Sequence, residues 1–339
     1  MINQKDLLHK TSGVTKISLP KSGFNLEATL DSGQVFGFRK MGPRVTPEGE
    51  ASAARSPNAS YGRARRSTEG GRIRGLICYE GMVNGFFSTL WQEKGVLCVE
   101  RIPDSNFTRA IRMYFDFDRD LSPLYRVLKS DERLSPAYRA FRGLRLIHQE
   151  SWEALASFIL SSNNNVKRVQ GIWQNLAAYF GGKLVLAKKG PAAGVTRFCH
   201  HTFPSAEQIA KSHEWILKGL GLGYRASFLL HTARFVAANP VCLEAIREAP
   251  YEEAKERVLA FPGIGEKVAD CVLLYGFQKF EAFPVDVWIL RVMRKLYFGG
   301  RKAAEKKIRA FAQKRWGGLA GYVQQYLFHG ARKGVYNTF

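Results

Sequence analysis

The pattern of hydrophobic and polar positions divides the chain into two regions. Up to about residue 100, short β-prone runs alternate with Gly, Asp-Ser-Gly and Glu-Gly turns. This pattern is typical of antiparallel strands joined by hairpins. The expected strands are 15–19, 26–30, 34–39, 73–79, 82–90 and 95–100.

From about residue 105 onward the apolar spacing becomes helical. Ser151 is the expected cap of a helix over 152–160, and Ser205 with Gln208 forms a capping box that opens 206–217. The triple Asn 163–165 precedes a helix that ends near 180. Further helices are expected at 224–238, 251–260, 266–277, 287–297, 303–315 and 319–333. The pattern therefore predicts an α+β protein, with an antiparallel β domain at 1–115 and an all-α domain of two lobes at 116–339.

One segment shows neither of these two patterns. Residues 46–72 contain no Val, Ile, Leu, Met, Phe, Trp or Cys, so they cannot bury enough surface to order themselves. We interpret about 43–72 as a flexible insertion in a hairpin. A DNA-touching tail is the alternative, because five Arg face three Glu there. The segment 187–202, with His200 and His201, reads as a loop, and a His pair without further ligands is too weak to predict a metal site.

Charge narrows the class of partner. Lys and Arg number 51 against 29 Asp and Glu, a net charge of +22, and residues 291–339 carry half of that excess. A polyanion, nucleic acid before an anionic membrane, is the expected partner. The chain has no apolar run that could span a membrane, and since its first ten residues contain no apolar core segment we expect no secretory leader. The five cysteines are scattered without a Cys-x-x-Cys pair. These features exclude a disulfide scaffold and favour an intracellular protein.

The segment 261–286 carries the candidate chemistry. The turn Phe-Pro-Gly-Ile-Gly joins two helices, with Gly263 and Gly265 leaving the backbone bare before a helix N-terminus, which suits a phosphate. Lys267 lies in the first turn, where the helix dipole would lower its pKa and make the amine nucleophilic. Asp286 precedes the next helix as a natural N-cap. Each residue also has a plain structural interpretation: a tight turn, a solvated Lys that touches phosphate, and a cap alone.

These residues resemble the helix-hairpin-helix superfamily of base-excision DNA glycosylases, with the hairpin at about 251–277. Within it, the chain is similar to the 8-oxoguanine DNA glycosylase/AP lyase branch. The resemblance runs from about residue 17 to 330, and its other blocks are Asp-Ser-Gly-Gln-Val-Phe at 31–36, Ser-Ser-Asn-Asn-Asn at 161–165, Gly-Leu-Gly-Tyr-Arg-Ala at 221–226 and Gly-Tyr-Val-Gln-Gln-Tyr-Leu-Phe at 321–328.

The resemblance implies a role for each matching residue. Lys267 would attack C1′ of the damaged nucleotide and form an imine, assisted by Asp286, and β-elimination would then cut the strand. The flipped base would lie between Cys271 and Phe328. The remaining implied roles are base recognition for Gln324 and for the carbonyl of Gly33, filling of the vacated stack for Asn163, a wedge for Tyr224, cytosine contacts for Arg168 and Arg225, and backbone contacts for Gly263 and Gly265.

Two positions depart from animal-type members of that branch. A His and an Asp expected after Asp286 and Phe328 are here Trp288 and Ala331, which favours a bacterial-type variant and leaves fine specificity open. The resemblance implies a metal-independent monomer that acts on duplex DNA without a cofactor. A monovalent cation at the hairpin, known in the family, remains open. We expect the protein in the nucleoid of a bacterium or the nucleus of a eukaryote, not outside the cell.

Other functions stay in view. They are a related glycosylase for an alkylated purine, a non-catalytic DNA-binding hairpin protein and a basic RNA-binding factor. Gln324 and Gly33 weigh against the first, Lys267 with Asp286 against the second, and the lack of an RNA motif against the third.

Overall fold

The structure is a computed structural model that describes residues 13–44, 76–101, 106–189 and 195–336. The predicted insertion 43–72 lies outside the described residues, apart from its first two positions.

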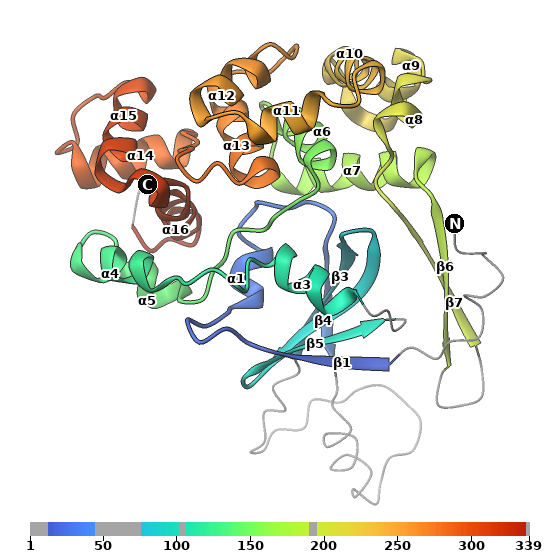
Figure 1. The fold of residues 1–339 in the computed structure, drawn as a ribbon, viewed down its shortest axis with the longest axis horizontal. Helices are drawn as coiled ribbons and strands as arrows, with labels where there is room; N and C mark the ends of the chain where they lie inside the picture. Colours follow the sequence, from blue (N-terminus) through green and yellow to red (C-terminus); the bar gives the residue numbers. More distant parts are fainter. Residues whose placement is uncertain (1–12, 45–75, 102–105, 190–194, 337–339) are drawn as a thin grey trace, which may run out of the picture.

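An antiparallel sheet forms the N-terminal part (Figure 1). Its five strands follow the spatial order β1-β5-β4-β3-β2, and the helix α1 (Leu26–Leu30) follows the first of them in the chain. Their bounds are β1 (Gly13–Ser18), β2 (Arg39–Arg44), β3 (Leu76–Val83), β4 (Phe86–Glu93) and β5 (Val96–Arg101). The predicted antiparallel sheet is therefore confirmed.

The rest of the chain is mostly helical, as predicted. Three helices follow the sheet: α3 (Phe107–Tyr114), α4 (Ser122–Ser130) and α5 (Ser135–Phe141). The helical layer at the top and left of Figure 1 then contains α6 (Ser151–Ser161), α7 (Val166–Phe180), α8 (Ala206–Ala210), α9 (Glu214–Leu217), α10 (Arg225–Ala238), α11 (Cys242–Glu248), α12 (Tyr251–Leu259), α13 (Glu266–Phe277), α14 (Val287–Tyr297), α15 (Glu305–Trp316) and α16 (Ala320–Arg332).

Two of the predicted strands are wrong. Residues 26–30 form α1, because the Asn25 side chain caps the segment by accepting a hydrogen bond from the Ala28 N–H at 2.9 Å. The apolar alternation of Leu26, Ala28 and Leu30 also suits a strand, which is why the pattern misled. Residues 34–38 are not a strand either, and β2 begins only at Arg39.

Two helical details also differ from the prediction. The cap of α6 is Glu150, whose carboxylate accepts from the N–H groups of Trp152 and Glu153, whereas the Ser151 hydroxyl donates to the Gly276 carbonyl. The capping box at Ser205 is present, but it opens a short α8, followed by α9 and a π-helical turn at Lys218–Leu222, instead of one helix over 206–217.

The expected loop 187–202 is instead part of a hairpin of β6 (Lys183–Lys189) and β7 (Val195–His201). This hairpin runs down beside the sheet in Figure 1. At its base the His200 ring stacks on Phe87 of β4, with centroids 3.7 Å apart. The hairpin thus ties the helical part to the sheet.

Two main hydrophobic clusters form the core. The smaller lies under the sheet and includes Phe117 and Ile147 from the chain beyond residue 115. The larger fills the helical part. The predicted domain boundary between residues 115 and 116 stays a prediction, and side chains from both sides of it share one core.

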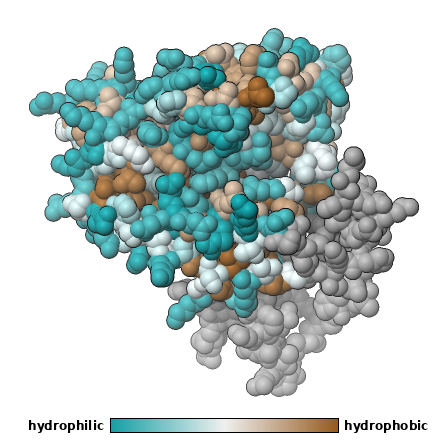
Figure 2. Space-filling view, in the orientation of Figure 1, coloured by the Kyte–Doolittle hydropathy of each residue, from teal (hydrophilic) through white to brown (hydrophobic). Residues whose placement is uncertain are grey.

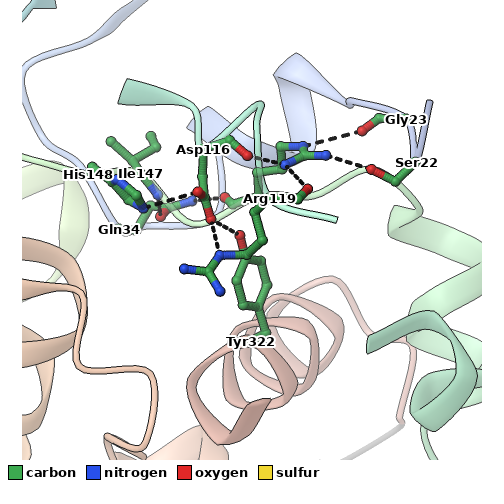
Figure 3. Close-up of polar contacts among 9 residues, drawn as sticks. Ser22, Gly23, Gln34, Asp116, Arg119, Ile147, His148 and Tyr322 are labelled. Carbon is green, nitrogen blue, oxygen red and sulfur yellow. Dashed lines mark hydrogen bonds and ion pairs between the residues drawn. The ribbon is translucent and has the colours of Figure 1, made fainter. Parts of the chain in front are cut away.

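A buried polar network joins the two parts (Figure 3). The Asp116 carboxylate accepts from the Tyr322 hydroxyl of α16 at 2.9 Å and from Nε of Arg119 at 2.6 Å. Arg145 is fully buried and donates to the Asp116 carbonyl and to Ser22 Oγ, the latter at 2.7 Å. Burial raises the pKa of Asp116, but the neighbouring His148, Arg119 and Tyr322 outweigh it, so the pKa lies below its usual value. The network keeps an ionised carboxylate between the sheet-side loops and α16.

Gln34 makes a second connection. Its side-chain amide donates to the carbonyls of Thr29 and Arg145, both at 2.9 Å, and its Oε1 accepts from the Ile147 N–H at 2.8 Å. The residue is fully buried. The segment 31–36 is therefore fixed against the strand-like connection that leads into α6.

The surface seen in Figure 2 is mostly hydrophilic, with small hydrophobic patches over the helical part. Within the described residues, none of the helices is long and apolar enough to cross a membrane.

Candidate active site

The turn between α12 and α13 forms a bare helix N-terminus. Gly263 has φ +78°, and a Cβ there would lie 2.2 Å from Cδ2 of Phe228, so glycine is required on both counts. Gly265 is the N-cap of α13 and offers no side-chain cap. Both glycines are exposed. The free N–H groups of α13 are therefore open to an anion, as the hairpin interpretation predicts.

Lys267 lies in the first turn of α13, half-buried, with Cys271 one turn further on the same face. Cys271 is 5% exposed. Burial raises the pKa of the Cys271 thiol to about 11, although the charge of Lys267 opposes the shift. The thiol is therefore neutral near pH 7 and offers a soft apolar surface beside the Lys267 side chain.

Asp286 is the N-cap of α14, as predicted, and its Oδ1 accepts from the Ile289 N–H at 2.8 Å. Burial raises the pKa of Asp286, and the Ile289 N–H and the charges of Lys267 and Arg332 oppose the shift. Capping and proximity to Lys267 thus coexist in one carboxylate. A cation that develops next to it would be stabilised.

Gln324 and Phe328 lie four residues apart on α16. Gln324 is 3% exposed, and its Nε2 donates to the Pro284 carbonyl at 3.1 Å. Its Oε1 is buried and has no hydrogen-bond partner in the structure. Since the bond to Pro284 fixes the amide, the free Oε1 is an acceptor held ready for an N–H group of a ligand.

Gly33 faces the same place from the N-terminal part. Its φ is +82°, and a Cβ there would lie 3.5 Å from Cε1 of Phe328 and 2.8 Å from Nη1 of Arg332. The preceding residue, Ser32, has its carbonyl held by Gln325 Nε2 at 3.2 Å. The structure therefore brings Gly33 next to Phe328, although the two residues are 295 positions apart in the sequence. Helix α16 provides Phe328 and also Gln325, which holds the residue before Gly33.

A second group of predicted residues surrounds the loop before α7. Asn163 is exposed with φ +47°, and Arg168 is exposed on α7. Arg225 is 5% exposed and donates to the carbonyls of Ser162 and Asn163, while its guanidinium lies 4.4 Å from the centre of the Tyr224 ring. In the structure Arg225 therefore supports the Asn163 loop. Tyr224 is half exposed, as a wedge requires.

The two departures from the animal-type pattern fall in apolar surroundings. Ala331 is buried in the larger core cluster, and Trp288 packs against the same cluster. At position 331, where the animal-type pattern has an Asp carboxylate, this chain has an alanine that packs in the apolar core.

Residues that sequence reasoning missed complete the site. Gln325 and Gln34 position the segment that carries Gly33, and Arg332 lies against it. The four-residue spacing of Gln324, Phe328 and Arg332 on one predicted helix face was the signal that could have indicated Arg332. Among the described residues, no cluster of three or more His, Cys, Asp or Glu side chains could hold a metal ion.

Family models match this architecture in two segments. Residues 16–155 match the 8-oxoguanine DNA glycosylase N-terminal domain, and residues 156–317 match the HhH-GPD superfamily of base excision DNA repair proteins.

Curated relatives agree. The chain is 35% identical over 278 residues to a probable N-glycosylase/DNA lyase of Methanothermobacter thermautotrophicus, a match that covers 78% of this chain and 87% of that protein. It is 32% identical over 253 residues to an N-glycosylase/DNA lyase of Saccharomyces cerevisiae, covering 63% of this chain and 64% of that one.

Two solved structures resemble the whole fold. One is MBOgg1 in complex with a low-affinity DNA ligand, at a TM-score of 0.76 and 27% identity over 95% of this chain and 99% of that one. The other is the Clostridium acetobutylicum 8-oxoguanine glycosylase/lyase in complex with double-stranded DNA that contains cytosine opposite 8-oxoG. Its TM-score is 0.75 at 25% identity, over 96% of this chain and 99% of that one. The chain therefore belongs to the N-glycosylase/DNA lyase family, within the HhH-GPD superfamily of base excision DNA repair proteins.

Proposed function

We propose that this protein is a bifunctional glycosylase/AP lyase that flips 8-oxoguanine, opposite cytosine, out of duplex DNA, excises it and cuts the abasic site. The observation that carries the proposal is the convergence of a half-buried Lys267 and the capping carboxylate of Asp286 with Gln324 and Phe328 of α16 and with Gly33. Relatives that share the architecture are named N-glycosylase/DNA lyase.

The proposed reaction needs only groups of this chain. The lone pair of the uncharged Lys267 amine forms a bond to C1′ while the C1′–N9 bond breaks and its electrons leave with the purine. Loss of a proton from nitrogen and opening of the sugar give an imine. Removal of a C2′ proton then expels the 3′ phosphate by β-elimination. Asp286 stabilises the positive charge that develops on the sugar and can accept a proton.

The residues that would surround the flipped base determine which base is excised. Cys271 and Phe328 would hold the two faces of the flipped base, and Oε1 of Gln324 would accept from its Watson–Crick edge. The carbonyl of Gly33 would accept the N7–H that 8-oxoguanine has and guanine lacks. Phosphate contacts at Gly263 and Gly265 and the basic surface would supply most of the affinity without sequence preference.

We further propose that the enzyme works as a monomer, without a metal or cofactor, in the compartment that holds the chromosome. A monovalent cation on the hairpin carbonyls is compatible with this mechanism but is not needed for any step of it.

Borohydride trapping tests the mechanism. With a duplex that contains 8-oxoguanine opposite cytosine, we expect the wild type to form a covalent adduct, because hydride reduces the imine to a stable amine. Lys267→Gln should form none, since an amide is not nucleophilic. If Lys267→Gln trapped at the wild-type level, another residue would be the nucleophile.

The alternative of an alkylated purine as substrate has one supporting observation. A DNA-3-methyladenine glycosylase of Bacillus subtilis is 25% identical over 62% of this chain. Excision of 3-methyladenine and of 8-oxoguanine from otherwise identical duplexes would decide. Faster release of the alkylated base would favour this alternative, and we expect the reverse because Gln324 presents a fixed acceptor to the base.

A further inference from the structure

Arg332, in the last turn of α16, is a cation that the mechanism above does not use. Its Nη1 is buried and has no hydrogen-bond partner in the structure. A buried donor without a partner is costly, and such atoms at a ligand site indicate a missing acceptor.

The guanidinium lies against the two residues that define one side of the base pocket. Nη1 would be 2.8 Å from a Cβ on Gly33, so it occupies the space that the glycine leaves free. The centre of the guanidinium is 5.4 Å from the centre of the Phe328 ring. Arg332 is therefore next to the carbonyl proposed to accept N7–H.

Spacing along α16 gives the edge of the base that Arg332 faces. Gln324, Phe328 and Arg332 follow one another at intervals of four residues, so they lie along one face of the helix. If the purine stacks on Phe328 with its Watson–Crick edge toward Gln324, its opposite edge, the imidazole edge with N7, C8 and N9, points toward Arg332. The electrostatic interaction of Arg332 with Asp286 agrees, because N9 carries the sugar that Asp286 serves.

The chemistry of that edge supplies the missing acceptor. Guanine has a C8–H, which accepts nothing, whereas 8-oxoguanine has an oxygen on C8. A guanidinium only donates hydrogen bonds. Guanine in the pocket would leave the buried Nη1–H unsatisfied, while 8-oxoguanine would satisfy it with a charge-assisted hydrogen bond.

We propose that Arg332 is a specificity-determining residue that donates an Nη1 hydrogen bond to the C8 oxygen of the flipped base. This inference rests on the proposed excision of 8-oxoguanine and assigns a second contact to the lesion beside that of Gly33. The two contacts are complementary, because one accepts N7–H and the other donates to the adjacent oxygen.

The test compares single-turnover reactions of the wild type, Arg332→Met and Lys333→Met. Met keeps the apolar stem of Arg and removes its donors. Lys333→Met removes one positive charge from the next residue, which is exposed. The substrates are duplexes with 8-oxoguanine, with 8-thioguanine, which keeps N7–H but offers sulfur as a weak acceptor, and with a preformed abasic site, which has no base.

For Arg332→Met we expect 8-oxoguanine excision to slow by about 10- to 100-fold, the loss typical of one charge-assisted hydrogen bond. The wild-type preference for oxygen over sulfur at C8 should shrink by about tenfold. Cleavage of the abasic site should fall far less, and Lys333→Met should follow the wild type on all three substrates.

Two outcomes would overturn the inference. One is an unchanged preference for oxygen over sulfur in Arg332→Met. The other is an equal loss on the 8-oxoguanine and abasic duplexes, which would show that Arg332 acts through Asp286. Arg332→Lys separates the charge from the geometry of the guanidinium, because Lys keeps the positive charge but not Nη1. If Lys restored the full excision rate, the proposed Nη1 hydrogen bond would also be contradicted. Failure of the wild type itself on 8-oxoguanine would instead refute the proposed function.

Discussion

At the scale of single residues, two influences on the ionisation of the Asp286 carboxyl group oppose each other. Asp286 must be ionised to stabilise a cationic sugar, yet burial raises its pKa. Its cap bond to Ile289 and the nearby positive charges of Lys267 and Arg332 limit that shift. The balance favours the ionised carboxylate in a partly buried site.

Asp286→Asn tests the division between capping and catalysis. Asn caps helices as well as Asp does, so the fold and the DNA affinity should change little. Excision should slow by at least about 100-fold, because the charge next to the sugar is lost. Single-turnover rates and equilibrium binding to an unreactive duplex measure the two effects. Equal losses in both would mean that Asp286 mainly holds α14.

The raised pKa of Asp286 also predicts a pH dependence. The carboxyl becomes protonated at a higher pH than an ordinary aspartate, so the acid limb of the excision rate should lie at a higher pH than an unperturbed aspartate would give. Removing a nearby positive charge with Arg332→Met should move this limb further up. A pH–rate profile of each protein measures the shift, and a downward movement would contradict the assignment.

His329 gives a prediction about stability. It is 2% exposed, and burial, with repulsion from Lys333 and Arg332, lowers its pKa to about 4. Above pH 6.5 the His329 ring is neutral in both the folded and the unfolded chain, so it does not affect stability. Between pH 6.5 and about 4 the ring binds a proton in the unfolded chain but not in the folded one, so the free energy of unfolding falls. This residue alone should therefore cost up to about 3 kcal/mol of unfolding free energy on acidification.

Denaturant unfolding of the wild type and His329→Phe between pH 7 and pH 4 measures that cost. Phe keeps a ring beside Phe141, whose centroid is 4.4 Å from that of His329, but it cannot titrate. The variant should lose less stability over this range. Parallel curves would show that His329 does not titrate within it.

The chemistry-bearing residues were the most predictable part of the site. Lys267 and Asp286 stand at helix starts, where spacing alone suggests a role, and both lie where predicted. The positioning residues Gln34 and Gln325 were not predictable, because each holds a backbone group far away in the sequence: Gln34 holds the Ile147 N–H, and Gln325 the Ser32 carbonyl. A glutamine inside an apolar helix face shows that it is buried but not what it binds.

At the scale of elements, the hairpin of α12 and α13 depends on one backbone position. Gly263 has a positive φ and no room for a Cβ against Phe228, whereas Gly265 has neither constraint. The two exposed glycines of one turn therefore form a matched pair.

Gly263→Ala should destabilise the protein by about 1–3 kcal/mol, from backbone strain and displacement of Phe228. Gly265→Ala should stay within about 0.5 kcal/mol of the wild type, since a Cβ there meets nothing within 4 Å. Denaturant unfolding of both variants checks the difference. Similar losses would mean that the turn relaxes without help from Phe228.

Element prediction succeeded where capping and period agreed. The helix over 287–297 and the capping box at Ser205 are confirmed because each rests on a local hydrogen bond. The segment 26–30 failed because five residues fit both periods. The β6–β7 hairpin was missed because the contact that fixes it against the sheet is nonlocal: His200 packs on Phe87, which lies far earlier in the sequence.

At the scale of the whole molecule, the positive charge has two uses. Residues 291–339 carry eleven of the 22 excess charges, a concentration that suits contact with a polyanion. Part of this charge instead holds the fold: Arg309 bonds to the buried Asp270 at 2.7 Å, and Arg315 to Asp131 at 2.9 Å. The remaining exposed Lys and Arg of α14 and α15 are the candidates for contacts with DNA.

The network around Asp116 predicts how the two parts of the chain support each other. Asp116→Asn keeps the shape and tolerates the φ of +51°, but it removes the charge that Arg119 and Arg145 face. We expect a loss of about 2–4 kcal/mol, since a buried charge pair is broken from one side. Thermal or denaturant unfolding measures it. A change below about 0.5 kcal/mol would mean that the network is replaceable.

The buried amide of Gln34 has a consequence for any attempt to divide this protein. Its two partner segments lie on opposite sides of the predicted domain boundary, so a fragment that begins at residue 116 loses the amide that Ile147 N–H and the Arg145 carbonyl require. Neither half is then a self-sufficient folding unit. The N-terminal part, which carries Gly33, and the helical part, which carries Lys267, should melt in one cooperative transition. A chain folded well enough to bind the lesion would then also be able to cut it.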